Sequence, residues 1–118
     1  MKYLCLIYYD EQQVDAMTDE QWIALVEQCI ANGEQLRENG HFIAGESLQP
    51  VRTAKTLRVR EGAVSVVDGP FAETHEQLAG FYLLDAQDMD EALRLAAEIP
   101  PARLGSVEVR PFRQLPDR

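Results

Sequence analysis

The segment from Thr18 to Gly40 carries both the start and the stop signal of one long helix. Thr18 and Gln21 have the spacing of a capping box, in which the hydroxyl and the amide each satisfy a free backbone donor of the first turn. Asn39-Gly40 supplies the left-handed residue that ends a helix. Between these signals apolar residues recur at helical spacing, so the segment is predicted to form an amphipathic helix. The residues of this apolar stripe are Trp22, Val26, Cys29, Ile30 and Leu36, widened by Ile23 and Leu25.

Strand patterns lie on both sides of this helix and return later in the chain. Apolar and β-branched runs predict strands, and the turn at Glu61-Gly62 between two alternating runs predicts a hairpin. A second helix is predicted to begin at the cap Asp88 and to end before Pro100-Pro101, because proline cannot donate the next helical hydrogen bond. Pro111 argues that the last strand ends at a sheet edge. The predicted strands cover residues 3–9, 41–48, 55–60, 63–68, 78–86 and 106–112.

The order of these elements is β-α-β, a hairpin, and then β-α-β again. It predicts an α+β fold of the ferredoxin-like, split βαβ type with an inserted hairpin, in which two helices cover one face of an antiparallel sheet. The other face carries alternate apolar residues and needs a cover, so a homodimer that pairs its sheets is predicted. Residues 1–118 are expected to form a single domain.

Composition limits the classes of partner. The chain has 20 acidic and 11 basic residues and a formal net charge of −9. A chain this acidic, with scattered basic residues, is not expected to bind nucleic acid or an anionic membrane surface. The apolar run at residues 3–9 is too short for a signal peptide or a membrane helix, and the cysteines Cys5 and Cys29 have no paired spacing. A cytoplasmic location is therefore expected.

No motif for metal, phosphate or nucleophile chemistry is present, so no metal and no cofactor are expected. The first candidate for chemistry is Asp68, which directly follows the Val66-Val67 strand. Its carboxylate could project into a cleft and act as a general acid or base. Asp-Gly-Pro is also a turn sequence in its own right, since the side chain of Asp bonds its own backbone and Gly accepts a positive φ. Both interpretations remain open.

Four further residues are candidates for the same site. His75, flanked by Glu73 and Glu76, could exchange protons near neutral pH, or it could be a solvated loop histidine. Phe71 could close a pocket, enter a partner subunit, or anchor its own loop. Tyr8 and Glu46 lie on predicted strands and could line a pocket for a small molecule.

The stretch "DGPFAET" (68–74), followed by "EQLAGFYLLDA", resembles the signature of the DGPF subgroup of YCII-related proteins. The opening "MKYLCLIYYDE", the segment "AGESLQP" and the final "IPPARLGSVEVRPF" agree with this resemblance, which covers essentially the whole chain. It implies a dimeric α+β barrel. It also implies an acid–base pair between Asp68 and a histidine of the first helix. The position of that histidine is occupied here by Cys29, and His75 stands where relatives commonly have lysine.

Two classes of function follow. The first is an enzyme that uses Asp68 with His75 on a small organic molecule. The second is a small-molecule-binding or regulatory accessory protein without turnover, because the resemblance implies a link to extracytoplasmic-function sigma factors. A purely structural dimer is a third possibility, and it predicts no pocket.

Overall fold

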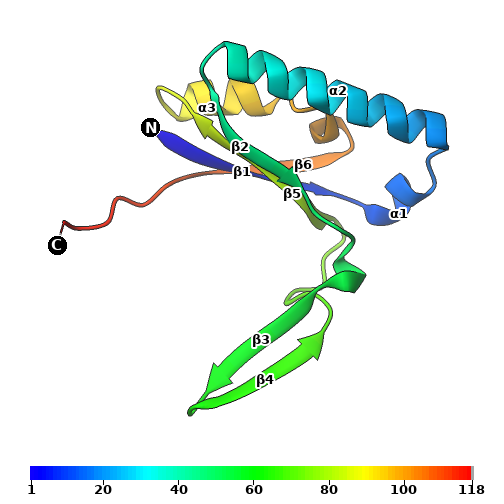
Figure 1. Ribbon diagram of the computed structural model, residues 1–118, viewed down its shortest axis with the longest axis vertical. Coiled ribbons are helices and arrows are strands. Elements are labelled where there is room, and N and C mark those ends of the chain that lie inside the picture. The colour runs from blue at the N-terminus through cyan, green and yellow to red at the C-terminus, as the bar shows by residue number, and fades with distance from the viewer. Residues whose placement is uncertain (118) are drawn as a thin grey trace.

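The computed structural model describes residues 1–117 and confirms the predicted α+β class. Figure 1 shows helices lying over a sheet and a two-stranded hairpin that extends away from both. The strands are β1 (Lys2–Tyr9), β2 (Phe42–Ser47), β3 (Lys55–Arg60), β4 (Ala63–Asp68), β5 (Gln77–Asp85) and β6 (Gly105–Pro111). The helices are α1 (Glu11–Asp15), α2 (Asp19–Glu38) and α3 (Met89–Ala96), with short 3₁₀ helices η1 (Val51–Thr53) and η2 (Pro100–Arg103).

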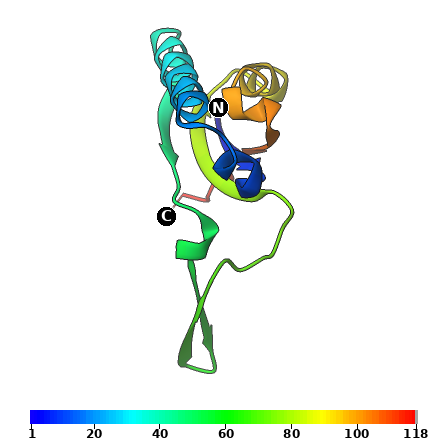
Figure 2. The ribbon, with the colours of Figure 1, turned by 90° about the vertical axis from the view of Figure 1, so that its right-hand side faces the viewer.

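The main sheet has four strands in the order β2-β5-β1-β6, and every neighbouring pair is antiparallel. This is the strand order of a split βαβ unit, so the predicted ferredoxin-like arrangement is confirmed. Figure 2 shows α2 and α3 on the same face of the sheet. β6 is an edge strand, as Pro111 predicts, and it ends at Pro111, one residue before the predicted end.

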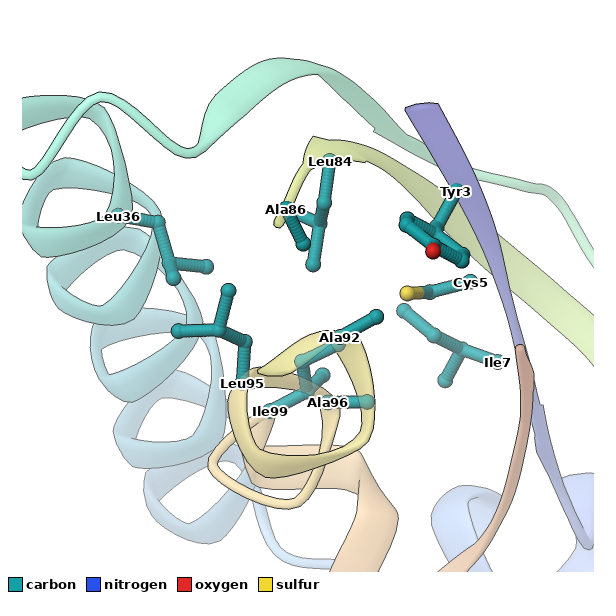
Figure 3. Packing of buried hydrophobic residues seen from close by; sticks show 10 residues of the cluster. All are labelled: Tyr3, Cys5, Ile7, Leu36, Leu84, Ala86, Ala92, Leu95, Ala96 and Ile99. Carbon is teal, nitrogen blue, oxygen red and sulfur yellow. The ribbon is translucent and has the colours of Figure 1, made fainter. Parts of the chain in front are cut away.

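Alternation along β1 separates a core face from an open face. Tyr3, Cys5 and Ile7 are buried, whereas Leu4 and Leu6 between them are only half-buried. Figure 3 shows side chains of β1, β5, α2 and α3 converging on one cluster. The cluster consists of Tyr3, Cys5, Ile7, Leu36, Leu84, Ala86, Ala92, Leu95, Ala96 and Ile99.

The strand register defines what we call the open face, the side of the sheet opposite α2 and α3. Leu4 pairs with Leu83, Leu6 pairs with Phe81, and Tyr8 continues the same row on β1. These apolar residues are half-buried. Helices α2 and α3 lie on the other face of the sheet (Figure 2). The open face of residues 1–117 is Leu4, Leu6, Tyr8, Leu78, Phe81 and Leu83.

The predicted capping box of α2 is present. The Thr18 hydroxyl accepts from the Gln21 backbone N–H at 3.2 Å, and the Gln21 side chain accepts from the Thr18 N–H at 2.9 Å. At the other end, Asn39 caps the helix and Gly40 adopts a φ of +81°. The helix therefore begins and ends where the sequence indicates.

We expect Thr18→Ala to lower the free energy of unfolding by about 1 kcal/mol, because it removes the oxygen that accepts from the first turn. Thr18→Ser keeps that oxygen and is the matched control. Urea denaturation followed by circular dichroism measures both. Equal midpoints for the alanine and serine variants would contradict the assigned role of the cap.

The predicted hairpin forms, but it does not join the main sheet. β3 and β4 make a separate two-stranded sheet, and the turn residues Glu61 and Gly62 have φ values of +51° and +77°. Two consecutive positive φ values give a turn whose twist matches that of the strands. We call residues 55–68 the arm. Every residue of β4, and every residue of β3 except Thr56, is exposed.

The short helix α1 was not predicted from the sequence. Its first turn is capped by Asp10, whose carboxylate accepts from the Gln12 N–H at 3.0 Å. Glu11 fixes the helix to the base of the arm, because it accepts from the Val51 N–H at 3.0 Å and its own N–H donates to Gln77 at 2.9 Å. Across residues 1–117, none of the helices combines the length and the apolar character that crossing a bilayer requires.

Candidate functional site

A cavity of about 390 Å³ lies between α2 and the β2–β5 half of the sheet. Its floor is made of small residues, which leave a space between α2 and the sheet. Ser47 of β2 pairs with Gly80 of β5, which follows Ala79, and Gly45 lies two residues before Ser47 on β2. These four positions leave the space that leucine or valine fills elsewhere in the sheet.

Two of the floor positions admit no side chain without a shift of their neighbours. A Cβ at Gly80 would lie 2.7 Å from the backbone oxygen of Glu46. A Cβ at Gly45 would lie 3.0 Å from ring atoms of both Phe42 and Tyr82. The floor is therefore kept small by close approach of backbone and rings.

The wall above the floor comes from the apolar stripe of α2. Trp22, Val26, Cys29 and Gly33 follow one another at helical spacing and all line the cavity. Trp22 keeps 44% of its surface exposed, and Ile30 keeps 56%. The apolar stripe predicted from the sequence therefore faces this cavity as well as the core. For that reason only Leu25 and Leu36 of α2 are buried.

Two aromatic rings and one cation line the cavity near the C-terminus of α2. The Phe42 and Tyr82 rings meet edge to face with centroids 5.5 Å apart. The guanidinium of Arg37 lies 4.7 Å from the centroid of Phe42. Arg37 also lines the cavity, so this contact holds a positive charge at the cavity wall.

The hydroxyl and thiol groups at the cavity are held in their protonated forms. Burial raises the pKa of Tyr82 to about 12, and its hydroxyl donates to the backbone oxygen of Cys29 at 3.4 Å. The pKa of Tyr9 is raised by burial and, secondarily, by the carboxylate of Glu11. Burial also raises the pKa of Cys29, against the opposing effect of Arg103. At neutral pH the cavity therefore offers neutral proton donors.

The raised pKa of Cys29 predicts slow alkylation at neutral pH, because the thiolate is the reacting species. The rate with iodoacetamide is expected to rise at a higher pH than that of the same cysteine in urea-unfolded protein. Mass spectrometry of quenched samples between pH 7 and 10 gives both rates. Cys5 is the internal control: it is fully buried, its pKa is raised to about 11, and it should stay unlabelled in the folded protein. A Cys29 profile at or below the unfolded one would contradict this assignment.

Asp68 lies away from this cavity, at the base of the arm. Its carboxylate accepts from the Lys55 ammonium at 2.5 Å, and its side chain is 87% exposed. Gly69 next to it has a φ of +100°, and its N–H donates to the Ala54 oxygen at 2.8 Å. The positive φ of Gly69 agrees with the turn predicted for Asp-Gly-Pro, but within residues 1–117 the Asp68 carboxylate bonds Lys55 rather than its own backbone.

His75 and Phe71 are exposed and do not line the cavity. Phe71 lies under the guanidinium of Arg58, with 5.4 Å between that group and the ring centroid. The His75 backbone oxygen accepts from Gln77. Within residues 1–117 the hydrogen bonds and ion pairs do not join the His75 imidazole to Asp68, and no group of three His, Cys, Asp or Glu residues is placed to hold a metal ion.

The two strand candidates lie on the open face. Tyr8 alternates with Ile7 and Tyr9, so its neighbour Tyr9 reaches the cavity and Tyr8 points to the opposite side. Glu46 is one of the cavity-lining residues, yet it pairs with Phe81 and its alternation directs the side chain to the open face. The sequence-based candidates missed Tyr9 and Arg37. Alternation from the buried Ile7 is the signal that identifies Tyr9.

Comparison with known proteins assigns the family. The profile of the YCII-related domain matches residues 1–116. This chain belongs to the YCII-related family. An uncharacterised protein of Rhizobium meliloti (strain 1021) is 41% identical to this YCII-related protein over 114 residues, which are 95% of this chain and 92% of the relative.

The fold of this YCII-related protein also occurs in a solved structure. The 5-chloro-2-hydroxyhydroquinone dehydrochlorinase from Burkholderia phenoliruptrix AC1100, in complex with 2,5-dihydroxybenzoquinone, superimposes with a TM-score of 0.56 and 14% identity. The match covers 96% of this chain and 94% of the other. At that identity the likeness establishes the shared fold.

Proposed function

We propose that this YCII-related protein binds a small hydroxylated ring compound in the cavity beneath α2. The observation that carries the proposal is the cavity itself, about 390 Å³ with aromatic walls from Tyr9, Trp22, Phe42 and Tyr82. That volume lies at the small end of ligand pockets, which suits a single ring. Aromatic walls stack on a planar ligand, and the neutral hydroxyls supply hydrogen-bond donors.

The electrostatics favour oxygen substituents on that ring. Arg37 is a cation that lines the cavity together with Glu34 and Glu46, and the Tyr9 and Tyr82 hydroxyls keep their protons at neutral pH. The Arg37 guanidinium and the Tyr9 hydroxyl donate to oxygen acceptors such as a ring carbonyl or phenolate, whereas the Tyr82 proton is donated to the backbone oxygen of Cys29. The dehydrochlorinase with the same fold holds 2,5-dihydroxybenzoquinone, a ring of this class.

An enzymatic role extends this proposal to proton transfer on the bound ring, with Asp68 and His75 as acid and base. Neither residue lines the cavity of its own chain. Catalysis by this pair therefore requires that the arm rearrange or that a second copy supply the two residues. Without such a change, the groups that line the cavity and can contact a bound ring are Tyr9, Tyr82 and Arg37.

A binding role without turnover, of the kind expected for a regulatory accessory protein, is the second candidate. It is favoured by the exposure of Asp68 and by its ion pair with Lys55, which occupies the carboxylate that an acid–base role needs. The same cavity serves both functions. Chromatography of the ring compound after incubation with the protein distinguishes the two functions. An enzyme consumes the compound, whereas a binding protein leaves it unchanged.

Isothermal titration with 2,5-dihydroxybenzoquinone tests the binding proposal, and intact-mass spectrometry excludes a covalent adduct. We expect saturable binding at one site per chain and slower alkylation of Cys29 by iodoacetamide when the ring compound is present, because the compound covers the thiol. Absence of binding, or binding that leaves the Cys29 alkylation rate unchanged, would contradict the proposed site.

A further inference from the structure

A second cavity, of about 310 Å³, lies between α1, the start of α2 and the chain that follows β2. We call it the α1 cavity. The side chains of Tyr9 and Trp22 line both this cavity and the one beneath α2. Glu11 fixes α1 over the chain after β2, because its carboxylate accepts from the Val51 N–H at 3.0 Å. The α1 cavity is therefore bounded by segments that hydrogen bonds hold together, and the ring site proposed above does not include it.

The lining of the α1 cavity is acidic on one part and apolar on the rest. Glu11, Asp15 and Asp19 contribute three carboxylates, and within residues 1–117 no basic residue lines the cavity. The pKa of Tyr9 is raised by burial and, secondarily, by the carboxylates of Glu11 and Asp15, so both charges act at the Tyr9 hydroxyl. The remaining lining residues are aromatic or aliphatic, with one methionine and one proline. The cavity thus combines a negative potential with apolar contact surface.

Two of the three carboxylates are free to accept hydrogen bonds from a ligand. The Glu11 carboxylate already accepts from the Val51 N–H. Across residues 1–117, the side chains of Asp15 and Asp19 take part in neither the hydrogen bonds nor the ion pairs. Both residues are exposed and line the cavity, so the donors of a ligand can replace the water that solvates their carboxylates.

The spacing of the carboxylates suits an organic cation rather than a metal ion. In the described chain, residues 1–117, no three His, Cys, Asp or Glu side chains are placed to hold a metal. An alkylammonium ion has other requirements, because its N–H groups need oxygen acceptors and its carbon chain needs apolar contacts. Tryptophan and tyrosine rings also attract cations, and Trp22 and Tyr9 line this cavity. A quaternary ammonium has no N–H and would leave the carboxylates of Asp15 and Asp19 without donors.

We propose that the α1 cavity binds a small aliphatic amine by its ammonium group. The carboxylates of Asp15 and Asp19 accept from the N–H groups, the two aromatic side chains contact the charged end, and the apolar lining contacts the alkyl chain. A volume of about 310 Å³ lies at the small end of ligand pockets, which suits a short chain. The amine site does not depend on a ring compound in the other cavity.

Hexylammonium is the probe, and hexanol is its neutral counterpart with the same carbon chain. Trp22 is the single tryptophan of the chain, so its fluorescence reports on the α1 cavity. At pH 7 the amine is protonated, since alkylammonium groups lose their proton only near about pH 10. We expect a saturable change in Trp22 fluorescence with hexylammonium and at least about 5-fold weaker binding of hexanol, which forms no charge-assisted hydrogen bond. Equal binding of the alcohol, or no binding of the amine, overturns the proposal.

Asp15→Asn/Asp19→Asn tests the two carboxylates, and Glu20→Gln/Glu27→Gln is the matched control. Each double variant removes two negative charges with little change in size, and Asp19 and Glu20 both lie in the first turn of α2. Glu20 and Glu27 are exposed and do not line the cavity. We expect hexylammonium to bind about 5-fold more weakly to the first variant and with near wild-type affinity to the second. Circular dichroism should show the same fold in both, because all four residues are exposed.

Equal affinities in the two double variants overturn the proposal, because the net negative charge of the chain would then attract the amine without a specific site. Gly33→Leu locates the amine independently of these charges. Gly33 lines the cavity beneath α2 and does not line the α1 cavity. We expect hexylammonium to bind Gly33→Leu with wild-type affinity. Loss of hexylammonium binding in Gly33→Leu would place the amine beneath α2 and overturn the proposal.

Discussion

Leu84→Ala is expected to lower the free energy of unfolding by about 2 to 5 kcal/mol, because it removes a branched side chain from the centre of the core. Leu84 is fully buried on β5 and lies beside Tyr3 of β1. Figure 3 shows it pointing toward the side chains of α2 and α3, so alanine at this position would leave a cavity among packed groups. Urea denaturation at a fixed protein concentration measures the loss.

Leu93→Ala is the control for this change. Leu93 lies on α3 with half of its surface exposed, and alanine is the better helix former. We expect the control to change stability by less than about 1 kcal/mol. If both variants unfold at the same urea concentration, the core is not centred on Leu84.

Local signals in the sequence predicted most of the elements. Thr18, Asn39 and Asp88 lie at helix ends because their side chains or backbone satisfy free backbone groups there. Such caps depend on residues a few positions away, so they can be read without knowing the fold. The turn at Glu61-Gly62 belongs to the same class. α1 was missed because its one turn buries no residue and so leaves no apolar pattern.

Tertiary placement was harder to predict. Alternation shows that the arm has two faces, but it carries no information on the distance between the arm and the main sheet. Asp68 was consequently considered for a cleft, and in the structure it pairs with Lys55 on an exposed strand. Alternation places Tyr9 on the same face of β1 as Ile7 and Tyr8 on the other, and the packed sheet shows that the helices cover the Ile7 face.

The cavity had no separate signal in the sequence. Its floor residues Gly45, Ala79 and Gly80 read as ordinary strand residues, and their small size matters only because they meet across two strands under one helix. Cys29 and Trp22 read as core positions of α2. A cavity forms where no large side chain fills the space between packed elements. Its presence therefore depends on the relative placement of elements that are distant in sequence.

Gly33→Leu is expected to abolish binding of 2,5-dihydroxybenzoquinone by filling the cavity from the helix side. Gly33 lies inside α2 and lines the cavity, and a Cβ there would have one neighbour within 4 Å, the Phe42 ring at 4.0 Å. A leucine side chain therefore enters open space rather than backbone. The lost volume should weaken binding by at least about 10-fold, equivalent to about 1.4 kcal/mol.

Gly33→Ala separates cavity filling from the change in the helix. Both substitutions replace a glycine inside a helix, which stabilises by about 0.5 to 1 kcal/mol. Only leucine extends far enough to occupy the ring site. We expect titration to give near wild-type affinity for the alanine variant and no measurable affinity for the leucine variant, while both unfold at or above the wild-type temperature. Because the leucine variant is no less stable, a loss of affinity reports the space it occupies. Equal affinities in the two variants would place the ligand outside the cavity beneath α2.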